Sequence, residues 1–129
     1  MLKINFFNEC QQNIDQSAIE KKAAKVLQEY GVDDVQFDLS MVSPEKIQEY
    51  NEKYLNHQGK TDVLSFPHHT AQQRQDVPLP PGELLHLGEI LICLEVAEQA
   101  ATDSGRSLTD QLCFYTEHGL MHLLGYHHL

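Results

Sequence analysis

The C-terminal stretch constrains the fold more than any other part of the chain. Ser107 and Asp110 have the spacing of a helix-starting capping box, with Asp in place of the usual Glu. We therefore expect a helix over 108–124. Its apolar residues fall on several sides, which is typical of a helix buried at the centre of a domain.

Half of the eight histidines lie in the last twelve residues. His118 and His122 are four apart, so a helix would place them on one face with about 5–6 Å between Cβ atoms. Gly125 can end that helix, because glycine takes the left-handed conformation without steric cost, and the chain can then bring His128 back. Three neutral imidazoles with an open fourth position are a common ligand set for catalytic zinc, although imidazole also suits Ni²⁺ and other divalent metals.

The spacing H-x-x-x-H-x-x-G-x-x-H matches the zincin pattern H-E-x-x-H-x-x-G-x-x-H at every position but one. Gly119 stands where a metalloprotease has the glutamate that acts as general base. The pattern therefore predicts a metal site that lacks the proteolytic base.

Three motifs in the same order resemble the YbeY family of bacterial metal-dependent endoribonucleases. The C-terminal stretch is similar to H-G-x-[LM]-H-L-x-G-Y-[DH]-H. Residues 61–67 read TDVLSFP, similar to T-[DN]-V-L-S-F-P, and residues 87–93 read LGEILIC, similar to L-G-[DE]-I-x-I-C. With Asn51 and Tyr54 in the spacing N-x-x-Y, the resemblance spans from about residue 50 to the C-terminus.

The resemblance implies a zinc-dependent, single-strand-specific endoribonuclease that acts in 16S rRNA 3′-end maturation and in ribosome quality control. Its implied partners are single-stranded RNA, the small ribosomal subunit and assembly factors. Two alternatives stay open: a metal-dependent hydrolase of another bond, such as a peptide, and a non-enzymatic ribosome-assembly factor with structural zinc. The missing glutamate argues against the first, and three histidines without a fourth protein ligand argue against the second.

Three further residues are candidates for catalysis. Glu89 is a candidate general base, with a sheet-edge or capping role as the equal alternative. Asp62 follows a threonine at the start of a strand, where an ordinary turn role is at least as good an interpretation. His127, where the family often has Asp, could support a ligand, transfer protons or compete for the metal. Ser65 is expected to be a hydrogen-bonded hydroxyl in a buried strand.

Leu55 departs from the family at a position that commonly carries an arginine thought to contact phosphate. A leucine cannot supply the planar fork that matches a phosphate group. Lys53 and Lys60 are the candidate substrate-binding residues that could act as point charges instead.

The formal net charge of −10 excludes RNA binding through bulk charge, because counterion release favours basic proteins. RNA would have to be held by a local patch, by the metal or within a larger assembly. Lys21, Lys22 and Lys25 cluster on one expected helix. We interpret them as a solvated helix face, with an RNA contact as the alternative.

Hydrophobic periodicity predicts one α+β domain over 1–129, with a four-stranded mixed sheet packed with about four helices around the buried C-terminal metal-binding helix. We expect strands at 2–8, 35–42, 62–66 and 87–93, and helices at 17–30, 44–55, 94–102 and 108–124. Ser17 and Glu20 have the spacing of a capping box at the start of the first helix, and Ser43 before Pro44 is the expected N-cap of the second. The proline-rich segment 67–86 is expected to be a long loop in which His68 and His69 are solvated, with a role as extra metal ligands as the alternative.

Three cysteines cannot all pair, and none lies in a C-x-x-C motif, which fits a reducing compartment. There is no run of 18 apolar residues and no stretch at the N-terminus like the apolar core of a signal peptide. We expect a cytoplasmic protein without a membrane partner. The sequence leaves its oligomeric state open.

Overall fold

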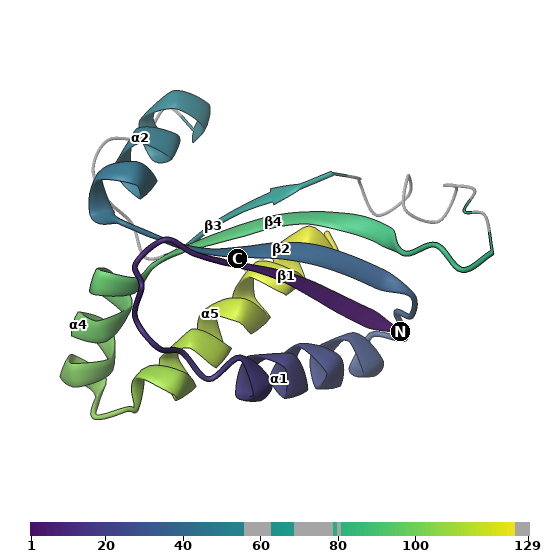
Figure 1. Ribbon diagram of the computed structural model, residues 1–129, viewed down its shortest axis with the longest axis horizontal. Helices are drawn as coiled ribbons and strands as arrows, with labels where there is room; N and C mark the ends of the chain where they lie inside the picture. The colour runs from purple at the N-terminus through teal and green to yellow at the C-terminus, as the bar shows by residue number, and fades with distance from the viewer. Residues whose placement is uncertain (56–62, 69–78, 80, 126–129) are drawn as a thin grey trace.

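The computed structural model describes residues 1–55, 63–68, 79 and 81–125, and this part of the chain forms an α+β domain (Figure 1). Its four strands are β1 (Leu2–Asn8), β2 (Val35–Val42), β3 (Val63–Pro67) and β4 (Leu85–Cys93), and its four helices are α1 (Gln16–Glu29), α2 (Pro44–Leu55), α4 (Leu94–Ser104) and α5 (Leu108–Leu123). The expected fold class and element order are confirmed.

The sheet is mixed, with strand order β1-β2-β4-β3. β1, β2 and β4 are parallel, and β3 is an antiparallel edge strand paired with β4. Helices α1, α4 and α5 lie on one face of the sheet, and α2 lies on the other (Figure 1). No described helix combines the length and apolarity that a membrane crossing needs.

The face covered by α1, α4 and α5 holds the main core. Alternate residues of β2 point into it, because successive side chains of a strand face opposite ways. Its fully buried members include Ile19, Ala23, Phe37, Leu39, Ile90, Ile92, Leu112 and Leu120. A smaller apolar cluster around Ile47 and Leu64 lies under α2 on the other face.

The uncovered part of that other face is polar. The carboxylate of Asp38 accepts a hydrogen bond from Asn5 Nδ2 at 2.9 Å and lies 3.0 Å from His86 Nε2. The ring of His68 stacks on His86 with centroids 4.6 Å apart. His68 is thus part of this surface network, while His69 lies outside the described residues.

A bulge in β4 decides which way its residues face. Gln36 pairs with His86 but Asp38 pairs with Glu89, so β4 has one residue more than β2 at this point. Gly88 lies in the bulge with φ +145°, and a Cβ there would meet the carbonyl oxygen of Phe66 and Leu123 Cδ2. Only glycine allows this close approach of β3, β4 and α5.

Two element boundaries differ from expectation. Helix α1 begins earlier, because Asp15 is its N-cap and accepts a hydrogen bond from Ala18 N at 3.0 Å, so the proposed capping box at Ser17 is wrong. β4 begins at Leu85, two residues early, because its pairing with Val35 of β2 extends the ladder beyond the apolar run.

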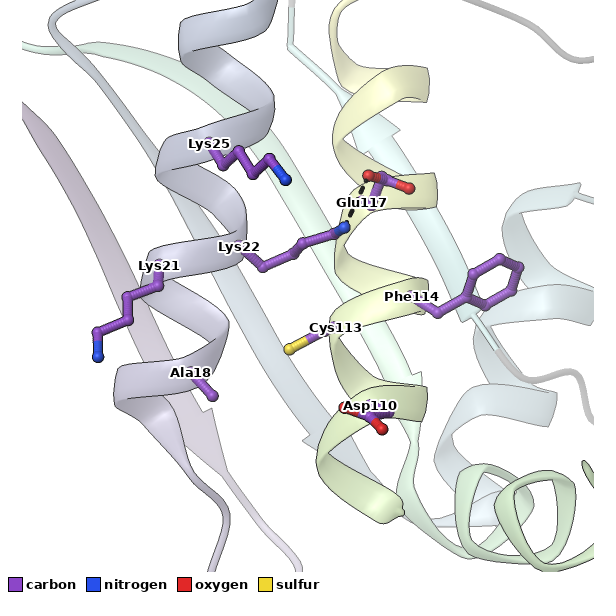
Figure 2. A pocket seen from close by; sticks show the side chains of 8 residues that line it. All are labelled: Ala18, Lys21, Lys22, Lys25, Asp110, Cys113, Phe114 and Glu117. Atoms are coloured by element: carbon purple, nitrogen blue, oxygen red, sulfur yellow. Dashed lines mark ion pairs between the residues drawn. The ribbon is translucent and has the colours of Figure 1, made fainter. Parts of the chain in front are cut away.

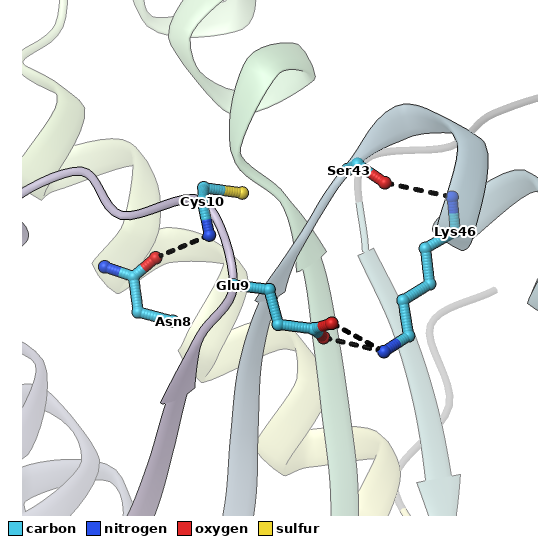
Figure 3. A network of polar contacts seen from close by, with 5 residues as sticks. All are labelled: Asn8, Glu9, Cys10, Ser43 and Lys46. Atoms are coloured by element: carbon cyan, nitrogen blue, oxygen red, sulfur yellow. Dashed lines mark hydrogen bonds and ion pairs between the residues drawn. The ribbon is translucent and has the colours of Figure 1, made fainter.

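The start of α2 is fixed to the end of β1 by polar contacts (Figure 3). Ser43 Oγ accepts a hydrogen bond from Lys46 N at 3.2 Å, which makes it the expected N-cap. Lys46 Nζ lies 2.7 Å from a carboxylate oxygen of Glu9, and this hydrogen bond raises the pKa of Lys46.

Helix α5 contacts α1, α4, β3 and β4, but it is not buried all round as expected. Its sheet-facing side is buried, whereas Phe114 is 47% exposed. Because the sheet and the two helices cover only part of its circumference, a strip along α5 stays open. The chain then turns at Gly125, whose φ of +92° lies in the left-handed region that favours glycine.

Candidate active site

The two histidines of α5 lie together as their spacing predicts. The ring centroids of His118 and His122 are 4.6 Å apart and their planes meet at 49°. Both side chains are half-buried at the open edge of the helix. This separation allows two imidazole nitrogens to approach one small ion.

Ser65 of β3 contacts the second histidine. Its Oγ lies 3.2 Å from His122 Nδ1. When Nδ1 carries the ring proton and donates it to Ser65, Nε2 keeps its lone pair for a metal. In this tautomer the ring is oriented by a hydrogen bond of the kind that metal-ligating histidines use, and the two imidazoles are donors that a zinc-type ion accepts.

Gly119 faces the sheet and not the histidines. A Cβ on this residue would lie 2.8 Å from Ile90 Cδ1, and Ile90 is completely buried. The position that carries the base in a metalloprotease therefore has no room for a glutamate. This gives a packing reason for the departure from the zincin pattern.

Several predicted site residues lie outside the described part of the chain: Asp62, Lys60, His127 and His128. Within the described residues, no three potential metal-ligating side chains gather at one point. The third ligand is thus not placed by the structure, and a metal held by His118, His122 and His128 remains a prediction.

Glu89 is not brought together with the histidines. It pairs with Phe66, whereas its neighbour Ile90 pairs with Ser65 on the side that faces α5. Successive strand residues face opposite ways, so the exposed Glu89 carboxylate lies on the other face of the sheet. The placement favours the sheet-surface interpretation over the role of general base.

Lys53 lies in an aromatic environment at the end of α2. Its Nζ is 5.3 Å from the centroid of the Tyr54 ring, which is 56% exposed. Tyr54 also lies edge-on to Phe66, with centroids 5.9 Å apart. A cation and an open aromatic ring are thus presented side by side.

A hollow of about 300 Å³ adjoins His118 and is lined by Phe114, Glu117 and Met121. Sequence reasoning did not single out Glu117 as a neighbour of the histidines. It also missed the link from Ser65 to His122, for which no local signal exists because the two residues are 57 positions apart.

Comparison with known proteins identifies the family. The profile of a family described as Endoribonuclease YbeY matches residues 5–129. The chain belongs to the YbeY family. YbeY proteins named endoribonucleases from Salinispora tropica and Clavibacter sepedonicus are 33% and 31% identical to it, each over 98% of this chain and over 83% and 82% of their own length.

A YbeY endoribonuclease from Bifidobacterium animalis subsp. lactis is 32% identical over 98% of this chain and 69% of its own length. The solution structure of a Thermotoga maritima protein aligns with the whole chain and with 75% of that protein, at a TM-score of 0.60 and 24% identity. This structural likeness supports the fold described above.

Proposed function

We propose that this protein is a zinc-dependent endoribonuclease that cuts single-stranded RNA. The observation that carries the proposal is the His118–His122 pair with Ser65 behind it, within a chain that belongs to a family whose members are named endoribonucleases.

Each described residue has a defined task in this proposal. His118 and His122 are ligands through neutral nitrogens, and Ser65 keeps the proton of His122 on Nδ1. His128 is the proposed third ligand. When bound, the ion supplies Lewis acidity that stabilises charge developing on a phosphoryl oxygen.

Lys53 and Tyr54, which lie with Phe66 on the α2 face of the sheet, are proposed to hold the substrate after it passes the edge strand β3. An exposed tyrosine can stack on a base of any sequence, and the ammonium beside it can contact a phosphate. Lys60 is the second proposed phosphate contact. Because Leu55 cannot form a fork with phosphate, these lysines act only as point charges.

The proton transfers are assigned to Asp62 and His127, because Glu89 faces away from the histidines. The proposed biological reaction is maturation of the 3′ end of the small-subunit rRNA, together with ribosome quality control in the cytoplasm. The proposed partners are the small ribosomal subunit and its assembly factors.

The test compares His118→Ala with wild type for metal content and for cleavage of single-stranded and duplex RNA. Loss of a metal ligand removes several kcal/mol of transition-state stabilisation, so cleavage should fall on the order of 10²–10³-fold. Chelation should abolish the wild-type activity, and zinc should restore it.

The matched control is His86→Ala, which removes a half-buried histidine on the opposite face of the sheet. It should keep both metal and activity. RNA cleavage that survives in His118→Ala would contradict the proposal. Metal binding without RNA cleavage by wild type would favour an assembly factor, and casein cleavage with zinc would favour a peptidase.

A further inference from the structure

An open groove runs between α1 and α5 (Figure 2). Its volume is about 400 Å³, and its lining includes Lys21, Lys22 and Lys25 from α1 and Phe114 and Glu117 from α5. Figure 2 shows Lys22 and Lys25 reaching across toward α5, while Lys21 points along the outer side of α1.

The groove is continuous with the candidate active site. Phe114 and Glu117 line both this groove and the hollow beside His118. Since residues three and four apart share a helix face, Phe114 and His118 stand one above the other on the open side of α5. A bound chain could therefore pass from the histidines to the lysines along one surface.

The charge of the groove contrasts with that of the whole chain. Three of the nine lysines and arginines line it, although the formal net charge is −10. Clustered cations create a local positive potential even on an acidic protein. The groove therefore offers a polyanion a local positive patch, although the protein as a whole is acidic.

Two carboxylates reduce this positive charge. Glu117 pairs with Lys22 at 3.2 Å, and Asp110 also lines the groove. Lys21 and Lys25 are exposed, and of these two only Lys25 reaches toward α5, as Lys22 does. The ion pair thus holds one of the three lysines in place in the middle of the groove.

The groove also contains Cys113. Burial raises the pKa of its thiol, which disfavours the reactive thiolate. Figure 2 shows the exposed ring of Phe114 on the side of α5 away from the lysines, where it adds an apolar surface beside the groove on which a base can stack. The lining therefore suits non-covalent binding.

We propose that the α1–α5 groove binds the backbone of the RNA strand that leads away from the His118–His122 site. Lys21 and Lys25 contact phosphates, Lys22 joins them when its ion pair with Glu117 opens, and a base rests on Phe114. The proposal rests on the proposed function, because the strand must be a single-stranded RNA held at the histidines.

The test measures binding of a single-stranded RNA of about 12 nucleotides by fluorescence anisotropy at several salt concentrations. Lys21→Ala/Lys25→Ala should bind about tenfold more weakly at low salt. The slope of log affinity against log salt should fall by about 0.7 for each lysine removed, because fewer counterions are released.

The matched control is Lys3→Ala/Lys46→Ala, which removes two positive charges from β1 and α2 instead. Its affinity and salt slope should stay close to wild type. A second variant, Glu117→Gln, frees Lys22 and removes a negative charge, so its RNA affinity should rise severalfold.

If Lys21→Ala/Lys25→Ala had the same RNA affinity and salt slope as wild type, the proposed role of the groove would be overturned. The proposal that the protein cleaves RNA would not be affected. The same loss in both double variants would show a general charge effect and would also overturn it. If Lys21→Ala/Lys25→Ala lost binding to polyglutamate as strongly as binding to RNA, the groove would be assigned to acidic proteins. Wild type that neither binds nor cleaves RNA would overturn both proposals.

Discussion

The two sides of helix α5 differ in burial and in role. The side toward the sheet is buried and includes Gly119, Leu120 and Leu123. The open side carries Phe114, and the half-buried His118 lines the hollow next to it. The same stretch of sequence therefore supplies part of the core and part of the candidate site, and close packing on one side fixes the position of the groups on the other.

The edge strand β3 marks the boundary between these two sides. Its residue Ser65 pairs with Ile90, which packs against Gly119, and also contacts His122. A substitution on the buried side of α5 should therefore change the free energy of unfolding. A substitution at β3, between the two sides, should change the affinity for a metal. Substitutions on each side test this separation.

Gly88→Ala should have the largest effect. Its φ of +145° is rarely adopted by residues with a side chain, and the added Cβ would meet the Phe66 carbonyl oxygen and Leu123. Strain and overpacking each cost about 1–3 kcal/mol, so we expect a loss of about 3 kcal/mol or more in the free energy of unfolding, measured in urea.

Gly82→Ala is the matched control, because Gly82 also has a positive φ, +86°, but a Cβ there meets nothing within 4 Å. It should lose only about 1 kcal/mol, the cost of the backbone conformation. Equal losses in the two variants would show that the close approach to β3 and α5 does not matter.

Ser65→Ala should weaken the proposed zinc binding about 10–100-fold, because the imidazole of His122 loses the partner that fixes its tautomer. Isothermal titration calorimetry measures this effect. Ser40→Ala, on β2, removes a hydroxyl elsewhere in the sheet and should leave zinc affinity unchanged. Unchanged affinity in Ser65→Ala would remove Ser65 from the site.

Gly119→Ala should cost about 1–2 kcal/mol in the free energy of unfolding. The new Cβ overpacks against Ile90, and the higher helix propensity of alanine offsets about 1 kcal/mol of the penalty. Ile90→Ala removes the three side-chain atoms that the new Cβ would meet, so the loss from Gly119→Ala should be smaller in that background. Additive losses would contradict the proposed contact.

Local sequence signals accounted for much of the fold. Ser43 and Ser107 cap their helices as expected, and His118 and His122 lie on one helix face. These features depend on residues within a few positions of each other, where backbone sterics and helical spacing decide the outcome. The same reasoning failed at Ser17, because Asp15 offered a competing cap two residues earlier.

The sequence by itself determined the order of elements, the helix face shared by the two histidines and the family. Only the tertiary structure decided that Ser65 meets His122, that Glu89 faces away from them, and that the lysines of α1 lie across a groove from α5. The reason is physical: these relations depend on strand order, on the bulge at Gly88 and on helix packing. Each of them joins segments far apart in the chain, which no local periodicity can encode.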